Sequence, residues 1–186
     1  MKRLFDLILS VIVLLILAIP MLVIALAVFS TSRGSIIYWS NRVGQDNVNF
    51  LMPKFRTMRE DTPAIATHLM NDAETYLTSI GGFLRSSSLD ETPQIFSILK
   101  GEMSFVGPRP ALFNQQDLIM LRTKKGVDKL KPGVTGWAQI NGRDELTILE
   151  KVDFDEEYLN LKSLKLDLKI LWVTILKVIS RINVSH

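Results

Sequence analysis

The clearest pattern in the chain is one long apolar run near its beginning. Residues 7–29 contain no charged side chain. As a straight helix this run would be about 35 Å long, which is enough to cross the hydrocarbon core of a bilayer. It is too long for the apolar part of a signal peptide, and a core helix of a soluble protein would show a polar face. The run therefore predicts attachment to a lipid bilayer.

A proline inside this run bears on how it sits in the membrane. Pro20 removes a backbone donor and crowds the preceding turn, so we expect a helix–break–helix. Basic residues flank both ends, among them Lys2 and Arg3 before the run and Arg33 after it. Such flanks favour the cytoplasmic side, where a re-entrant helix places both of them and a spanning helix only one. A spanning helix is the commoner arrangement, and the residues alone leave both open.

Beyond residue 33 the patterns predict a mostly α domain with a small β-hairpin. Two short strands are expected at 35–39 and 48–55, on either side of a turn at 44–47. Helices are expected at 64–80, where Gly81-Gly82 would end the first of them, and at 93–99, 118–121, 146–161 and 167–182. We therefore expect a membrane-inserted segment of residues 1–33 and a compact cytosolic domain of residues 34–186.

The last expected helix combines apolar residues with basic ones such as Lys169 and Lys177. This combination suits an interfacial amphipathic helix lying on an anionic membrane surface. An ordinary amphipathic helix packed on the core explains the same pattern equally well.

Composition narrows the chemistry of the 186 residues. The net charge of +3 is too small for a polybasic surface, so no nucleic-acid partner is expected. Cysteine is absent, which excludes thiolate nucleophiles and disulfides. The two histidines, His68 and His186, make Ser-His-Asp hydrolysis and His-rich metal sites poor candidates. What remains is chemistry performed by carboxylates, arginines and lysines.

Two adjacent carboxylates are the first candidates. Asp90 and Glu91 precede Pro93, a residue tolerated in the first turn of a helix, where the helix dipole favours anions. An ionised carboxylate can attack phosphorus, and its neighbour can bind a hard cation such as Mg²⁺. Taken alone, the pair is explained more simply as a helix cap, with Glu91 complementing the dipole.

Two further motifs carry arginine or glycine. Residues 107–110, Gly-Pro-Arg-Pro, hold Arg109 between two prolines, which limits the entropy it loses on binding a phosphate. A rigid turn with a solvated arginine is the alternative. Residues 131–143 contain glycines that would let a ligand approach the backbone closely, but they match neither a P-loop nor GxGxxG.

In this order behind an apolar segment, the motifs resemble the bacterial sugar transferase family, the small monotopic polyprenol-phosphate phosphoglycosyl transferases. The resemblance covers nearly the whole chain, and the matching segments are residues 54–58, 85–94, 101–110, 132–143 and 163–174. It implies a protein of the bacterial inner membrane whose catalytic domain, residues 34–186, faces the cytoplasm. The implied partners are a UDP-sugar, undecaprenyl phosphate and the lipid bilayer.

Members of this family transfer a phosphosugar from a UDP-sugar to a polyprenol phosphate and release UMP. The resemblance implies that Asp90 is the nucleophile of a ping-pong reaction with a covalent aspartyl-phosphosugar intermediate, and that Glu91 binds the cofactor Mg²⁺. It also implies phosphate or substrate contacts for a set of matching positions: Lys54, Arg85, Arg109, Arg143 and Asp167.

Pro20 matches the proline that kinks the family's re-entrant helix, which favours the re-entrant path. The family commonly has serine before that proline, whereas this chain has Ile19, so the break would rest on Pro20 alone. A homodimer and the identity of the sugar stay open. The alternatives are a membrane-anchored scaffold, in which Asp90 only caps a helix, and a phosphohydrolase that uses water as the acceptor.

Overall fold

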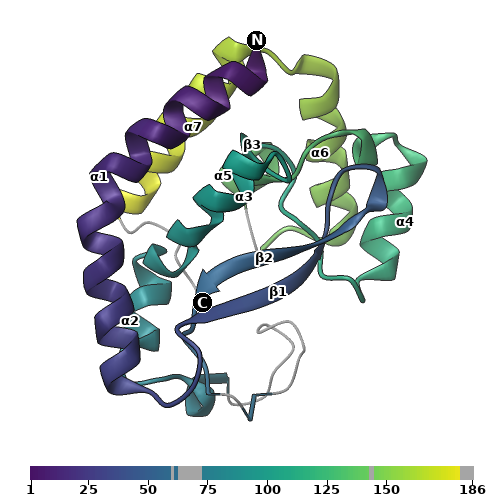
Figure 1. Ribbon diagram of the computed structural model, residues 1–186. Helices are drawn as coiled ribbons and strands as arrows, with labels where there is room; N and C mark the ends of the chain where they lie inside the picture. The colour runs from purple at the N-terminus through teal and green to yellow at the C-terminus, as the bar shows by residue number, and fades with distance from the viewer. Residues whose placement is uncertain (60, 63–72, 143–144, 181–186) are drawn as a thin grey trace.

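The N-terminal helix α1 (Lys2–Thr31) runs along one side of the molecule, and the other elements pack against its inner face (Figure 1). The computed structural model describes residues 1–59, 61–62, 73–142 and 145–180. The strands are β1 (Ile37–Val43), β2 (Asn49–Phe55), β3 (Ser104–Val106) and β4 (Gly133–Thr135). The other α-helices are α2 (Gly81–Ser86), α3 (Ile95–Lys100), α4 (Gln116–Lys124), α5 (Trp137–Ile140), α6 (Ile148–Leu161) and α7 (Leu164–Ser180). Short 3₁₀-helices are η1 (Gln45–Asn47), η3 (Ala73–Tyr76), η4 (Leu89–Gln94) and η5 (Val127–Lys129).

Helix α1 is continuous through Pro20, so the structure shows a bent helix where the sequence predicted two helices separated by a break. The bend lies near the middle of the helix (Figure 1). The buried residues of α1 are Asp6, Ser10, Ile24 and Val28. Its outer face is an exposed apolar stripe that begins at Leu4 and ends at Phe29. By length and composition the helix could cross a membrane, and the re-entrant path stays a prediction.

Both ends of α1 are tied to the same domain. At the start, Lys2 Nζ lies 2.6 Å from a carboxylate oxygen of Asp167, and Arg3 donates to two carbonyl oxygens at the end of α3. At the other end, Arg56 donates to the backbone and side-chain oxygens of Ser32, at 3.1 and 2.9 Å. The helix therefore lies along the domain from end to end.

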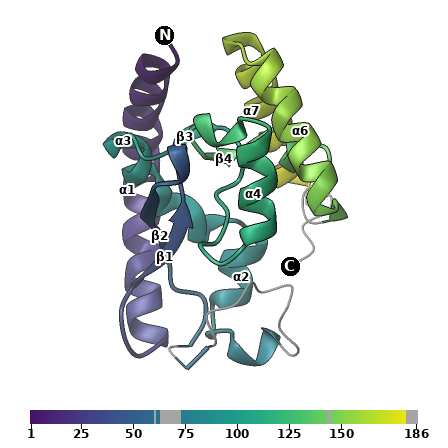
Figure 2. The same ribbon diagram turned by 90° about the vertical axis from the view of Figure 1, so that its right-hand side faces the viewer.

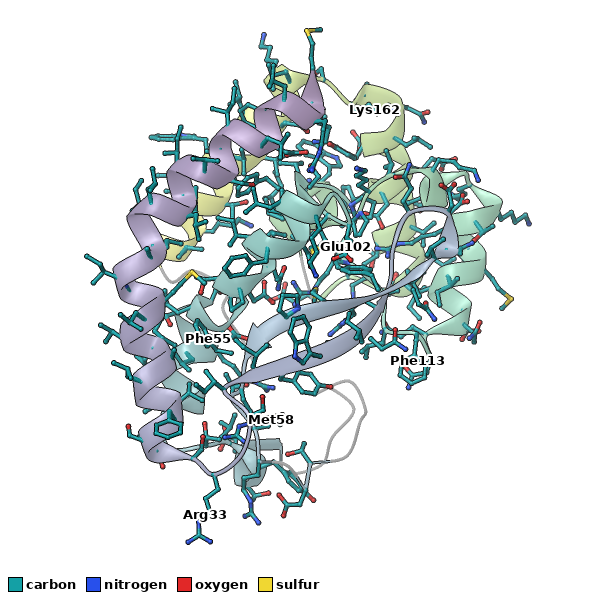
Figure 3. The ribbon with its side chains drawn as sticks, in the orientation of Figure 1. Arg33, Phe55, Met58, Glu102, Phe113 and Lys162 are labelled. Atoms are coloured by element: carbon teal, nitrogen blue, oxygen red, sulfur yellow. The ribbon has the colours of Figure 1, made fainter. Side chains whose placement is uncertain are left out.

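The predicted hairpin is confirmed. β1 and β2 pair antiparallel over their full lengths, from Ile37 opposite Phe55 to Val43 opposite Asn49. The first strand extends beyond the expected 35–39 because it keeps a partner in β2 as far as Val43. Phe55 is buried where the hairpin meets α1 and α2, so the hairpin and the membrane helix share one hydrophobic cluster (Figure 3).

A second, two-stranded sheet was not predicted. β3 and β4 pair in parallel, and each has only three residues, too few to show an alternating pattern. Three glycines make this pairing possible. A Cβ at Gly107 would collide with the carbonyl oxygen of Lys131, and Cβ atoms at Gly133 and Gly136 would collide with backbone atoms of Gly107. The glycines of residues 131–143 that meet Gly107 therefore admit another strand's backbone, and the expectation of a ligand there is wrong for them.

The helix expected at 64–80 is wrong over its described part. Residues 73–76 form a 3₁₀ turn, and Gly81 begins α2 where the sequence predicted that it would end a helix. A Cβ at Gly81 would collide with the carbonyl oxygen of Thr57, so close packing, and not a helix C-cap, requires glycine here. Residues 64–72 lie outside the described residues.

The two C-terminal helices are confirmed. α6 begins with a capping box, in which Thr147 and Glu150 bond to each other's backbone. α7 packs one face on the core through the fully buried Ile170, and its opposite face exposes apolar side chains such as Leu168 and Trp172. Core packing and an apolar surface thus coexist on α7.

Candidate active site

The segment that carries Asp90 and Glu91, here called the dyad, is η4. It begins after Ser88, whose left-handed backbone (φ 57°) turns the chain sharply into the dyad. In the described residues, η4 has no side-chain capping hydrogen bond. Asp90 is buried, with 7% of its surface exposed. The helix-cap explanation of the dyad therefore finds no support in the geometry.

Glu91 is held by two cations. Its Oε1 accepts hydrogen bonds from Lys54 Nζ at 2.7 Å and from Arg109 Nη2 at 3.0 Å. Lys54 projects from the end of β2, against which η4 packs, and Arg109 comes from the Gly-Pro-Arg-Pro turn. Burial alone would raise the pKa of Glu91, but Lys54 and Arg109 outweigh it and hold the pKa well below its usual range. Glu91 is therefore a carboxylate at any physiological pH.

Asp90 is the more strained electrostatic case. Burial raises the pKa of Asp90, as does the neighbouring charge of Glu91, while Lys54, Arg85 and Arg109 lower it. The net shift is upward. A buried carboxylate that is short of hydrogen-bond partners is poorly solvated, and so it is more nucleophilic than one in water.

Arg42 joins this group, although the sequence gave no reason to select it. Its Nη1 donates to the carbonyl oxygen of Pro110 at 3.1 Å, and its Nε donates to Ser40 Oγ at 2.9 Å. Burial and the nearby Arg109 lower the pKa of Arg42 to about 10, which keeps it charged at neutral pH. Only the hairpin's position beside the Arg109 turn reveals Arg42.

The Arg109 turn is fixed from below by a buried ion pair. Arg122 Nη1 donates to the carbonyl oxygen of Arg109 at 2.8 Å, and Arg122 also forms an ion pair with Asp155 at 2.7 Å. Asp155 belongs to the stretch of acidic residues in α6 that resembles a metal-binding DxD. Its contact with Arg122 gives it a structural role.

The remaining predicted site residues separate from this cluster. Asp167 pairs with Lys2 and accepts a hydrogen bond from Tyr158 Oη at 2.6 Å, so its described contacts anchor α1. Pro20 lies within α1, and Arg143 lies outside the described residues. The structure therefore gathers five of the predicted residues into one site: Lys54, Arg85, Asp90, Glu91 and Arg109.

The donor set is compatible with Mg²⁺. No group of three or more metal-binding side chains occurs among the described residues, so a metal would find two carboxylates here. Mg²⁺ in phosphoryl-transfer sites is commonly held in this way, by one or two carboxylates together with substrate phosphates and water. Glu91, ionised and buried at the substrate side, is the natural protein ligand, with Asp90 beside it.

A cavity of about 310 Å³ opens beside the dyad. Glu91 and Arg109 line one part of it, and α1 and α7 contribute to its walls. Figure 2 shows these two helices at opposite sides of the view, with β3 and β4 between them. The site thus combines a cation-lined carboxylate pair with a cavity that reaches the most apolar helices of the chain.

A cluster of this kind, next to an apolar helix with an exposed lipid-like face, defines a phosphoryl-transfer site at a membrane surface. The sequence model of the bacterial sugar transferase family matches residues 1–181, and the chain belongs to this family.

Curated relatives share about two fifths of their residues with the chain. A UDP-glucose:undecaprenyl-phosphate glucose-1-phosphate transferase of Escherichia coli K12 is 40% identical over 186 residues, which is 95% of this chain and 40% of that protein. A UDP-galactose-lipid carrier transferase of Erwinia amylovora is 38% identical, over 97% of this chain and 41% of that protein. An uncharacterized sugar transferase of Bacillus subtilis, EpsL, is 39% identical over 96% of this chain and 87% of its own length. The chain therefore spans about two fifths of the first two relatives and most of the third.

Proposed function

We propose that this protein transfers a sugar 1-phosphate from a UDP-sugar to undecaprenyl phosphate and releases UMP. The observation that carries the proposal is the burial of Asp90 among Lys54, Arg85 and Arg109, with no helix to cap. The printed names of the relatives support the choice of substrates, since the Escherichia coli relative uses UDP-glucose and undecaprenyl phosphate by name. UDP-glucose and UDP-galactose are accordingly the first donors to test.

In the first half-reaction, a carboxylate oxygen of Asp90 forms a bond to the phosphorus that bears the sugar. The bond from that phosphorus to the bridging oxygen breaks, and its electron pair leaves with UMP. In the second half-reaction, a phosphate oxygen of undecaprenyl phosphate attacks the same phosphorus, and Asp90 regains its carboxylate. Neither step needs a proton donor, which agrees with a site built from carboxylates and cations.

The cations have separate tasks in this scheme. Arg109 and Lys54 neutralise the diphosphate of the donor and the charge that develops as the oxygens rearrange around phosphorus. Arg85 lies close enough to Asp90 to lower its pKa, so it favours the ionised nucleophile. Glu91 would hold Mg²⁺, which when bound withdraws charge from the diphosphate and makes UMP a better leaving group.

The contacts of α1 support a monotopic, re-entrant attachment. A straight helix of 30 residues would be about 45 Å long. If it crossed the bilayer, the domain that contacts both Lys2 and Ser32 would have to lie within the lipid. With the apolar stripe of α1 facing lipid and its polar contacts facing the domain, both ends stay on one side, which basic flanks place at the cytoplasmic face of a bacterial inner membrane.

The test uses purified protein in lipid nanodiscs with radiolabelled UDP-glucose or UDP-galactose. Without an acceptor, the wild-type protein should become covalently labelled and release one UMP per active site; with undecaprenyl phosphate it should turn over. Asp90→Asn should abolish both signals, because an amide cannot attack phosphorus. Asp117→Asn, an exposed position on α4, is the matched control. Normal turnover by Asp90→Asn would overturn the covalent mechanism.

A further inference from the structure

The cavity beside the dyad has a composition that the donor substrate does not explain. Its polar end contains Glu91 and Arg109, where a phosphate would bind. Most of the remaining wall is apolar, with contributions from Val13 and Leu17 of α1, Phe105, and Leu171, Ile175 and Val178 of α7. A nucleotide or a hexose presents polar groups on all sides, so walls of this kind suit it poorly.

One polar side chain stands out on this apolar wall. Gln139, on α5, lines the cavity, and both its Oε1 and its Nε2 are buried without a hydrogen-bond partner among the described residues. Buried amides nearly always have partners in folded proteins, because an unmet donor or acceptor is costly. An amide left unpaired at the edge of a cavity therefore points to a ligand that completes it.

The position of the cavity indicates where that ligand comes from. Leu17 and Ile175 belong to the two helices with exposed apolar faces, and Ile175 is itself 51% exposed. A molecule that passes from the lipid to the dyad between α1 and α7 would stay in contact with apolar side chains until it meets Arg109 and Gln139. The ligand that fits has an apolar chain and a single phosphate head.

We propose that this cavity binds the phosphate-proximal end of the isoprenoid acceptor, and that Gln139 donates a hydrogen bond to the acceptor's phosphate. The inference rests on the proposed function, since it assigns that function's second substrate to a place in the fold. Gln139 then acts in the second half-reaction, when the acceptor phosphate attacks the phosphorus held on Asp90. The donor, which reacts first, does not depend on it.

The two half-reactions separate the acceptor from the donor experimentally. The first is measured alone by exchange of labelled UMP into UDP-sugar, and the second by transfer from the labelled protein to undecaprenyl phosphate. Gln139→Met keeps the bulk of the side chain and removes the amide. We expect it to raise the KM for undecaprenyl phosphate about tenfold, with UMP exchange within twofold of the wild type. Gln116→Met, at an exposed position of α4, is the matched control.

A second pair of variants tests the apolar wall without touching Gln139. Leu17→Trp should fill the cavity from α1 and raise the KM for undecaprenyl phosphate, with a smaller effect for a short-chain isoprenyl phosphate. Leu15→Trp, on the outer face of α1 where the side chain is 75% exposed, should change neither value.

Three results bear on the inference in different ways. If Gln139→Met lowers UMP exchange as much as transfer, Gln139 binds the donor's phosphate and the inference is wrong. If both Gln139→Met and Leu17→Trp leave the acceptor KM unchanged, the acceptor binds elsewhere. Absence of UMP exchange in the wild-type protein would instead contradict the proposed function itself.

Discussion

Lys2, in the first turn of the membrane helix, forms a 2.6 Å ion pair with Asp167, in the first turn of α7. The carboxylate of Asp167 is almost fully buried, and its other oxygen accepts a hydrogen bond from Tyr158. Tyr158 in turn packs beside Val106, at the end of the strand that leads into the Arg109 turn. This network therefore fastens the beginning of α1 to the part of the domain that carries the active-site arginine.

The first prediction follows from this network. Asp167→Asn removes the charge that pairs with Lys2 and weakens the bond from Tyr158, so we expect the free energy of unfolding to fall by about 1–3 kcal/mol. Chemical denaturation in detergent micelles measures it. The KM for the UDP-sugar should stay near the wild-type value, because Asp167 lies apart from the dyad cluster. Lys165→Met, an exposed change on the same helix, is the control, and a large rise in KM for Asp167→Asn would restore a substrate-binding role.

A second prediction concerns the acid side of the pH profile. Asp90 reacts as a carboxylate, and burial raises its pKa, so activity should be lost on acidification at a higher pH than for an exposed aspartate. Arg85 lowers the pKa of Asp90, so Arg85→Met should raise that pKa further and move the acid limb to higher pH. The measurement is kcat/KM for UMP release across the acidic and neutral range. Arg33→Met, at an exposed residue beyond α1, should leave the limb in place (Figure 3); identical limbs for both variants would contradict the effect.

Lys54 gives a third prediction. Lys54→Met removes one of the two cations that hold Glu91 and leaves a buried carboxylate with a single partner. We expect kcat/KM for the UDP-sugar to fall by about 100-fold, as when one stabilising donor is lost from a preorganised site. Lys54→Arg, which keeps the charge, should recover part of this loss. Lys124→Met, on the exposed face of α4, should have wild-type kinetics, and a Lys54→Met variant with the same kinetics would exclude Lys54 from the reaction.

Divalent cations give a fourth prediction. Chelation with EDTA should abolish UMP release, and added Mg²⁺ should restore it, because the site offers two carboxylates and relies on the substrate for further oxygen ligands. Glu91→Gln should need a higher Mg²⁺ concentration for half-maximal activity. Full activity in EDTA would remove the metal from the scheme.

The fifth prediction addresses the glycines that join β3 to β4. Gly107→Ala would drive a methyl group into the backbone of Lys131, so we expect a loss of about 1–3 kcal/mol in the free energy of unfolding. Gly82→Ala is a matched control within α2, where the added methyl would meet only Leu77 at an ordinary distance of 3.8 Å. That variant should be as stable as the wild type or slightly more so, because alanine favours helix. Equal stability of the two variants would contradict the close approach of the strands.

The sequence by itself determined the parts of this protein that depend on neighbours in the chain. The apolar run made α1, strand patterning around a turn made the hairpin, and the Thr147 cap and helical periodicity made α6 and α7. The order of the charged motifs also pointed to Lys54, Arg85, Asp90, Glu91 and Arg109 as one site. Each of these inferences rests on a local period or on a motif, and both survive without knowledge of the packing.

Only the tertiary structure decided which distant residues meet. It gave Asp167 to Lys2, placed Arg42 beside Arg109, and assigned Gly107 and Gly133 to the contact between two strands. It also left the amide of Gln139 unpaired at a cavity. The physical reason is that ion pairs, close backbone contacts and unmet hydrogen bonds are set by separations of a few ångströms between segments far apart in the chain. Neither periodicity nor composition records those separations.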